Sequence, residues 1–265
     1  SNTDAVTDPP DQGDRMGLFV EAWIRADLDE LWARTQDPAQ HRRWDLRFTQ
    51  IDYLPRAEGE PQRFRYATRV LPFLTIAGTG VSAGERERPD GTRTSALRFA
   101  SPHPLSLLAE GSGYWRYVPD GDGVRFLTGY DYRPRWGVFG ALADRVLFRP
   151  LMGWATAWSF DRLRLWLERG VTPERALVNW LVEIAVRACV VGFACTGLGL
   201  ESLLLLFGPF AASLAYLCPL LLSVAVCVAL FASPLSRTPA ARRCLRRPPV
   251  RARAPRVLRT LENPR

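Results

Sequence analysis

Three side chains in this sequence could transfer protons. His41 and Asp45 lie four residues apart, and His103, the second of only two histidines, stands between two prolines. Imidazole and carboxylate groups are the usual general acids and bases of enzymes. His41, Asp45 and His103 are therefore the candidate catalytic residues. Each also has a plain structural interpretation: a solvated helix residue, a cap or turn residue, and a loop residue. Asp131, the remaining acid considered, is expected to face outward.

Aromatic residues offer a different kind of chemistry. Tyr66, Tyr117, Tyr130 and Tyr132, with the indole of Trp115, fall on the predicted inner faces of strands, where no Asp, Glu or His accompanies them. Phenols and indoles can orient a ligand but rarely drive a reaction alone, so binding without catalysis is favoured. The candidate ligand contacts are Trp44, Phe64, Tyr66, Phe99, Trp115, Tyr117, Phe126, Tyr130, Tyr132, Trp154 and Trp158.

Motifs for metals and cofactors are missing from the sequence. There is no phosphate-binding glycine loop and no nucleophile elbow. All five cysteines lie at or beyond Cys189, which leaves residues 1–188 without a disulfide or a cysteine metal site and agrees with a reducing compartment. We therefore expect no metal and no cofactor.

The elements that would position these aromatics begin with a hairpin. Asp120-Gly121-Asp122-Gly123 is strong turn chemistry, and a two-residue loop at Gly121-Asp122 predicts pairing of residues whose numbers sum to 243. Tyr117 then faces Phe126, Trp115 faces Thr128, and Gly113 leaves space beside Tyr130. A second strand, 62–71, alternates arginines with Phe64, Tyr66, Thr68 and Val70, so one face is solvated and the other buried.

A long helix is predicted from Phe139 to Glu168, ending at Gly170. Pro150 should kink or break it, because proline lacks the amide that an interior position needs. An apolar stripe along this helix should form the lid of a cavity; it comprises Leu147, Leu151, Trp154, Trp158 and Leu165. For Trp154 and Trp158, core packing and ligand contact are equally good interpretations.

The order of elements resembles a known superfamily. A strand near residues 18–26 precedes the DLDELW helix (27–32) and the DPAQHRRWD helix (37–45); antiparallel strands and one long helix follow. This arrangement resembles the SRPBCC or START-like helix-grip superfamily, which includes bacterial polyketide cyclase/dehydratase-like and lipid-binding proteins. The resemblance covers about residues 16–170 and implies an α+β fold, in which a curved antiparallel sheet grips the long helix around a hydrophobic cavity.

The C-terminal part of the chain has a membrane-protein composition. No charged residue occurs from Ser202 to Ser236, a run of 35 residues, and about 20 apolar residues suffice to cross a bilayer. Ten arginines and one acid follow, a net charge of +9; since the whole chain carries +8, residues 1–236 carry −1. The domain is therefore not a basic nucleic-acid binder, and the tail should lie on the cytoplasmic side near anionic lipid. The other interpretation is an arginine-rich tail that reflects a biased genome, since the chain has no lysine.

We expect four regions along the chain. Residues 1–15 are a disordered segment, 16–170 the ligand-binding domain, 171–236 a transmembrane helical hairpin, and 237–265 a disordered basic cytoplasmic tail. The hairpin has spans near 181–203 and 210–232, with Glu183 and Arg187 paired and a turn at Gly208-Pro209. A single span, with the first apolar helix lying on the bilayer or against protein, is the alternative.

Together these features predict a cell-membrane protein whose domain, in the cytoplasm, binds a lipid-like or polyketide-like hydrophobic molecule. The predicted partners are that molecule and membrane lipid, without nucleic acid; no protein partner can be named. A membrane-bound cyclase or dehydratase is the first alternative and requires His41, Asp45 or His103 to face the cavity. A structural or interaction subunit of a membrane assembly is the second, with a cavity filled by side chains.

Overall fold

The computed structural model describes residues 17–57, 59–71, 74–103, 106, 108–204 and 212–247. The chain divides into two units. The sheet domain comprises the chain up to Gly170 and again from Ala240 onward, and the helical unit comprises Val171–Pro239. The predicted disordered N-terminus (1–15), the Gly208-Pro209 turn and the tail beyond residue 247 lie outside the described residues.

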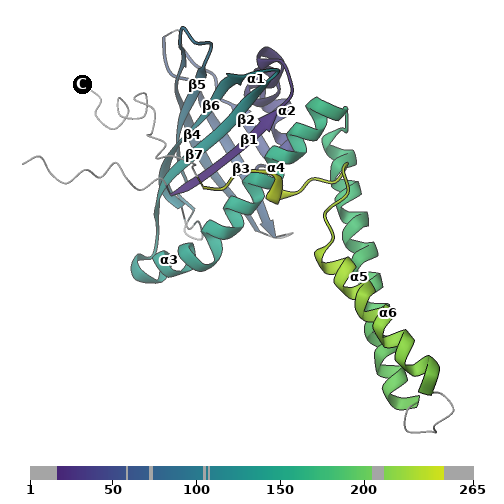
Figure 1. Ribbon diagram of the computed structural model, residues 1–265. Helices are drawn as coiled ribbons and strands as arrows, with labels where there is room; N and C mark the ends of the chain where they lie inside the picture. Colours follow the sequence, from purple (N-terminus) through teal and green to yellow (C-terminus); the bar gives the residue numbers. More distant parts are fainter. Residues whose placement is uncertain are drawn as a thin grey trace, which may run out of the picture. The chain divides into compact units, whose positions relative to one another are not determined.

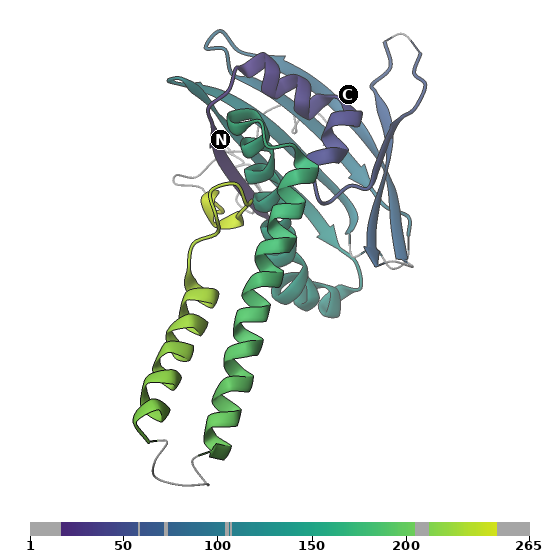
Figure 2. The same ribbon diagram turned by 90° about the vertical axis from the view of Figure 1, so that its right-hand side faces the viewer.

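A seven-stranded antiparallel sheet forms the body of the sheet domain, with the strand order β1-β7-β6-β5-β4-β3-β2. Its concave face holds the long helix α4, as Figures 1 and 2 show. The strands are β1 (Leu18–Ile24), β2 (Gln50–Tyr53), β3 (Arg63–Leu71), β4 (Leu74–Glu87), β5 (Arg93–Ala100), β6 (Leu108–Asp120) and β7 (Gly123–Pro134). This is the predicted helix-grip architecture.

The β6–β7 hairpin has the predicted register. Asp120 pairs with Gly123, Tyr117 with Phe126 and Trp115 with Thr128. Gly121 has φ +63°, which glycine adopts without strain at the turn. Because side chains alternate between faces, this register places Trp115, Tyr117 and Phe126 on the concave side, where a shift by one residue would place arginines.

Two short helices lie at one end of the concave face. Helix α1 (Leu28–Gln36) begins after Asp27, whose carboxylate accepts hydrogen bonds from the amides of residues 29 and 30. Helix α2 (Pro38–Trp44) begins after Asp37, which accepts one from the Ala39 amide. Both acids are N-caps, a role that Asp side chains commonly fill. Helix α2 carries both His41 and Trp44.

The predicted long helix is interrupted. Helix α3 (Gly137–Ala143) leads into a π-helical turn, η2 (Asp144–Phe148), and then into α4 (Arg149–Arg169), with Pro150 in the first turn of α4. The break near Pro150 is therefore confirmed, as is the stop at Gly170 with φ +62°.

The apolar stripe is wrong at its first two positions. Leu147 is 67% exposed and Leu151 55% exposed, whereas Trp158 and Leu165 are buried. In the π-helical turn the amide of Arg149 bonds to the carbonyl of Asp144, five residues back. A π turn inserts about one residue into the helical repeat, so residues before and after it face different directions.

The beginning of the predicted tail is ordered and packs on the sheet domain. The Ala240 amide and the Arg243 guanidinium both bond to the buried carboxylate of Asp161, at 2.8 and 2.9 Å. Leu245 then pairs with Glu21 on the β1 edge through two backbone hydrogen bonds of 2.8 and 2.9 Å. We call residues 240–247 the strap; its turn η4 spans Ala241–Arg243. Disorder was predicted there because arginines dominate the sequence, but Asp161 and the free strand edge give this segment specific partners.

In the described part of the helical unit, helices α5 (Pro173–Leu204) and α6 (Ala212–Phe231) run side by side, as Figures 1 and 2 show. Residues Pro173–Gly197 are long and apolar enough to cross a membrane; among the described residues this is the one such helix, and the apolar stretch Pro219–Phe231 is shorter. Glu183 and Arg187 pair at 2.6 Å, as predicted. Arg187 also donates to the carbonyls of Ala229 and Ala232, which stabilises the C-terminal end of α6.

Candidate functional site

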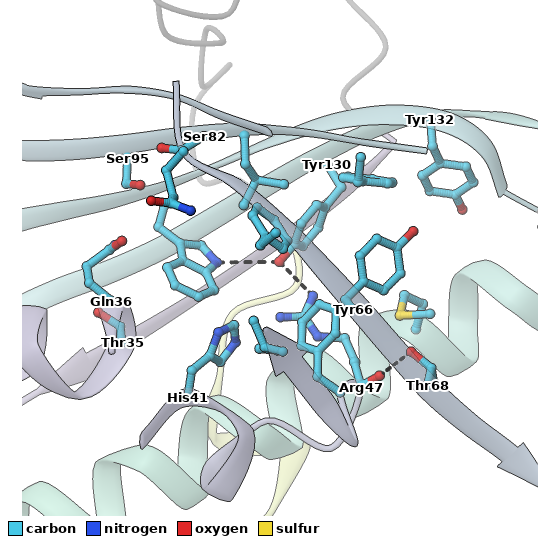
Figure 3. A pocket seen from close by; sticks show the side chains of 18 of the residues that line it. Thr35, Gln36, His41, Arg47, Tyr66, Thr68, Ser82, Ser95, Tyr130 and Tyr132 are labelled. Carbon is cyan, nitrogen blue, oxygen red and sulfur yellow. Dashed lines mark hydrogen bonds between the residues drawn. The ribbon is translucent and has the colours of Figure 1, made fainter. Parts of the chain in front are cut away.

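A cavity of about 160 Å³ lies in the sheet domain between the concave face, the α1–α2 end and the start of α4. Its walls are aromatic and aliphatic, with a few polar side chains among them. The residues that line it are Leu18, Thr35, Gln36, His41, Arg47, Phe48, Ile51, Tyr53, Gln62, Phe64, Tyr66, Thr68, Ser82, Ser95, Leu97, Phe99, Trp115, Tyr130, Tyr132, Phe148 and Met152. Figure 3 shows many of them, with His41, Arg47 and Tyr130 converging on its interior.

Six of the eleven predicted ligand contacts line this cavity: Phe64, Tyr66, Phe99, Trp115, Tyr130 and Tyr132. All six lie on β3, β5, β6 or β7, at positions that alternation assigns to the concave face. Burial raises the pKa of the Tyr66 phenol to about 12, so it stays protonated.

The other five do not line the cavity; four of them are buried core residues and Trp154 is half-buried. Trp44 is fully buried and donates to the carbonyl of Arg34 at 3.0 Å. The Tyr117 hydroxyl is held by Thr35 at 2.7 Å, and Phe126 stacks on Phe160 with ring centroids 4.4 Å apart. Trp154 and Trp158 stack on each other, with centroids 6.3 Å apart. Alternation predicts which face of the sheet a side chain lies on. It does not predict whether a helix packs directly against that part of the face or leaves a cavity there.

A buried ion pair supports the polar part of the cavity wall, which Arg47 lines while Asp45 lies behind it. The Asp45 carboxylate accepts from Arg47 Nε at 2.9 Å and from Nη2 at 2.6 Å, and both side chains are almost completely buried. Burial by itself would raise the pKa of Asp45, but the charge and hydrogen bonds of Arg47 hold it well below its usual value. Arg47 in turn stays protonated because Asp45 outweighs its desolvation. The pair adds no net charge to the cavity.

A hydrogen bond from Arg47 holds the Tyr130 hydroxyl at the cavity surface. Arg47 Nη1 donates to the Tyr130 hydroxyl oxygen at 2.6 Å, and the Trp115 indole lies 3.4 Å from the same oxygen. The hydroxyl therefore acts as an acceptor for protein groups, and its own proton has no acceptor among the described residues. Because a cation bonds to the oxygen, the O–H is a stronger donor than an isolated phenol.

His41 lines the cavity with its side chain only 12% exposed, so it is not solvated as its simplest interpretation predicted. Its Nε2 lies 3.0 Å from Asp45 Oδ2, and its ring packs against Trp44, Trp115 and Phe48 at centroid distances of 5.0, 4.8 and 5.2 Å. Burial lowers its pKa more than Asp45 raises it. With Asp45 ionised, Nε2 carries the proton it donates, so in the neutral ring Nδ1 is an acceptor.

A second polar group marks the other end of the cavity, near the π-helical turn. The Tyr132 hydroxyl donates to Asp144 Oδ1 at 2.5 Å, and Arg149 Nη2 bonds to Oδ2 at 3.0 Å. Burial and the bond to Asp144 raise the pKa of Tyr132. In Figure 3 Tyr132 lies apart from His41 and Arg47, with Tyr66 between them.

The remaining sequence candidates lie elsewhere. His103 is in a loop outside the cavity lining, where its carbonyl accepts from Arg135 at 2.9 Å. Asp45 lies behind His41 and Arg47 and does not line the cavity itself. Asp131 is exposed, in the orientation predicted. Of the three catalytic candidates, the structure places His41 alone on the cavity surface.

Sequence reasoning missed Arg47, together with the polar lining residues Gln36 and Gln62. Arg47 follows α2 in the segment Asp45-Leu46-Arg47, where neither helical nor strand periodicity assigns a face. The one available signal is the acid two residues before it, because Asp45 Oδ1 also accepts the Arg47 amide at 3.0 Å. Among the described residues, no group of three or more His, Cys, Asp or Glu side chains could hold a metal ion.

Comparison with known proteins gives both sequence and structural relatives. No family model matches the chain. The uncharacterized membrane protein YndG of Bacillus subtilis (strain 168) is 46% identical over 168 residues, which is 63% of this chain and 63% of YndG. The chain is thus matched over less than two thirds of that relative's length.

Solved structures match little more than half of the chain, at low identity. A STAR-related lipid transfer protein fragment from Xanthomonas axonopodis is 21% identical, with a TM-score of 0.43, over 56% of this chain and 84% of that one. The di-domain ARO/CYC StfQ from the steffimycin biosynthetic pathway is 15% identical, with a TM-score of 0.42, over 57% of this chain and 50% of that one.

The apolar helix in α5 and the similarity to a membrane protein associate the chain with a membrane. In the sheet domain the strand order, the two short helices at one end and the long helix on the concave face agree with the sequence resemblance. The chain therefore has the START-like helix-grip fold, joined to an apolar helical unit.

Proposed function

We propose that this protein is a membrane-anchored carrier that holds a hydrophobic small molecule, lipid-like or polyketide-like, in the cavity of its sheet domain. The supporting observation is the Tyr130 hydroxyl, an available donor in a largely apolar cavity. A ligand that is mostly apolar but carries one carbonyl or hydroxyl oxygen complements this arrangement. Apolar walls with a few placed polar groups are typical of small-molecule sites.

The volume of the cavity limits the size of the group that can bind in it. About 160 Å³ is less than the roughly 300–1,000 Å³ of sites for drug-sized molecules. The bound group is therefore a small ring system or one end of a longer chain. A strongly charged headgroup has no counter-charge inside, because Arg47 is neutralised by Asp45.

The test is native mass spectrometry and organic extraction of the full chain, purified from membranes in a mild detergent. Leu97→Trp places an indole into the cavity, and Arg98→Trp adds the same side chain at the next, exposed position of β5. We expect an apolar molecule to co-purify with the wild type and with Arg98→Trp but not with Leu97→Trp. A folded protein that takes up no apolar probe would instead favour the interaction subunit.

The role of Tyr130 has its own test. Tyr130→Phe keeps the ring but removes the donor, so affinity for an oxygen-bearing ligand should fall by about 1–3 kcal/mol, while an apolar hydrocarbon probe should bind equally well. Equal losses for both ligands would show that the substitution acts through packing.

We also propose that the helical unit crosses the membrane twice, as a hairpin whose two ends are cytoplasmic. The chain leaves the sheet domain after Gly170 and rejoins it at Ala240, which bonds to Asp161 of α4. That both ends of residues 171–239 join the sheet domain supports an even number of crossings over a single one. The basic residues that follow are expected on the cytoplasmic side.

The topology is tested with single-cysteine variants in intact cells and in inverted vesicles. A cysteine placed between α5 and α6, at position 208, should react with an impermeant maleimide from the outside. One at exposed Arg242 of the strap should react from the inside. Labelling of both from one side would contradict two crossings.

A membrane-bound cyclase or dehydratase-like enzyme is the second candidate. It is favoured by one contact, the 3.0 Å approach of His41 to Asp45 at the cavity surface, because a carboxylate that fixes an imidazole is a common arrangement for a general base. If His41 is a general base, His41→Gln should abolish turnover of a co-purified molecule, while the protein still binds that molecule. Unchanged turnover would exclude this role.

A further inference from the structure

One apolar surface of the sheet domain has no partner among the described residues. It lies on α3, the π-helical turn and the first turn of α4, and we call it the α3 surface. Phe139 and Val138 are 84% and 85% exposed, and Leu142 and Val146 are 61% and 68% exposed. Trp136, Leu147 and Leu151 complete it with exposures of 49–67%. A contiguous set of large exposed apolar side chains usually marks an interaction site.

The backbone is shaped to present these residues. Trp136 has φ +69°, a left-handed conformation that is unfavourable for a bulky side chain, and Gly137 follows with φ +56°. This sharp turn separates α3 from the end of β7. In Figure 1, α3 projects at the end of α4 opposite to α1 and α2. The π-helical turn then directs Leu147 and Leu151 outward, away from the core.

The charges around this surface favour an anionic partner. The segment 135–151 contains three arginines and one acid, Asp144. That acid is buried and bound by Arg149, so its charge is not presented to a partner. Arg145 is exposed on the same segment. Apolar residues with Trp at one edge and arginines beside them are the composition of helices that lie in the bilayer interface.

We propose that the α3 surface docks on the bilayer, with Phe139, Leu142 and Val146 inserted at the acyl boundary and Arg145 at anionic headgroups. The apolar helix of the same chain keeps the sheet domain close to a membrane, which raises the effective concentration of lipid for such a contact. The surface also borders the cavity, because Phe148 and Met152 on the same segment line it. Docking is a property of the surface itself and does not require a cavity ligand.

The oligomeric state of the full chain is first measured in detergent, and the chain is then placed at one copy per nanodisc, with a photoreactive diazirine on the lipid acyl chains. Trypsin releases the peptide Trp136–Arg145, which carries most of the surface. We expect it to be cross-linked, as the α5 peptides are. The peptide ending at Arg25, which contains the exposed Trp23 of β1, should remain unlabelled.

Two variants of the α3 surface and two control variants make the test specific. Phe139→Ser with Leu142→Ser should lower labelling of the 136–145 peptide by about tenfold or more, from the apolar area lost. Arg145→Gln removes a trypsin site, and since Arg149 precedes Pro150 this variant releases the longer peptide Trp136–Arg162. Its labelling, compared with the sum of the wild-type peptides 136–145 and 146–162, should fall only in discs that contain phosphatidylglycerol. Trp23→Ser, a matched loss of an exposed aromatic, should change nothing, and Leu97→Trp, with its cavity blocked, should still be labelled.

The proposal is overturned if the 136–145 peptide is labelled no more than the Trp23 peptide while α5 is labelled. It is also overturned if the double serine variant, with an unchanged thermal midpoint, is labelled like the wild type. A stable dimer in which this peptide is protected would assign the surface to a second copy of the chain instead. Because the Leu97→Trp arm has no ligand, failure of the carrier function leaves these outcomes unchanged.

Discussion

Asp45→Asn tests the polar wall of the cavity most directly. The substitution keeps size and shape but removes the charge that faces Arg47. Asn can keep one carbonyl oxygen toward the Arg47 amide and Nε, which lie 3.0 and 2.9 Å from Oδ1. It replaces the acceptor of the 2.6 Å bond from Nη2 with an amide that can only donate. A guanidinium that is 7% exposed is then left without a counter-charge.

The size of the loss follows from this geometry. Removing one partner of a buried ion pair costs about 3–5 kcal/mol. Because the retained oxygen preserves part of the network, we expect the free energy of unfolding to fall by about 3 kcal/mol, the lower end of that range. Replacing both members, as in Asp45→Asn with Arg47→Met, should restore part of this loss, since no buried charge remains.

The assay is urea unfolding of the sheet domain in the full chain, in detergent, followed by tryptophan fluorescence. Asp131→Asn is the matched control, because Asp131 is an exposed carboxylate on β7 and should change stability by less than about 0.5 kcal/mol. A loss below about 1 kcal/mol for Asp45→Asn would refute the reasoning, because Arg47 would then have found water or another partner.

Three further predictions follow from described contacts. Burial lowers the pKa of His41 below 6.5, so the unfolded chain takes the proton first; stability should decline as pH falls from about 6.5, and His41→Gln should remove this component in urea titrations. A methyl group at residue 113 would lie 2.5 Å from Tyr130 Cδ1, so Gly113→Ala should cost about 1–3 kcal/mol and weaken ligand binding, whereas equal affinity would show that Tyr130 can move. Burial raises the pKa of Cys244 to about 12, so this thiol should resist alkylation at neutral pH, and Asp161→Asn, which loosens the strap, should increase its reaction rate at least about tenfold.

Local sequence signals predicted the hairpin and the helix ends. The Asp-Gly turn at 120–123 predicted the β6–β7 register, because the turn and the alternation of side chains are properties of consecutive residues. Gly170 predicted a helix end for the same reason. Together with the resemblance, these signals led to the correct architecture.

The cavity itself was only half predicted. Strand alternation distinguishes the concave face from the convex one, and six of the predicted residues do line the cavity: Phe64, Tyr66, Phe99, Trp115, Tyr130 and Tyr132. Their contact with a ligand stays a prediction. Arg47 was missed since it sits in an irregular segment, where no periodicity applies. Tyr117 and Phe126 share the correct face but lie where α1 and α4 close against the sheet.

By itself the sequence determined the antiparallel hairpin, the order of elements, the apolar helical unit and the concentration of positive charge after residue 236, because each depends on neighbouring residues. The tertiary structure alone decided that Asp45 neutralises Arg47, that His41 faces the cavity, that the strap joins the β1 edge and that Leu147 and Leu151 point outward. Those features depend on contacts between distant segments and on one π-helical turn, and neither leaves a local pattern in the chain.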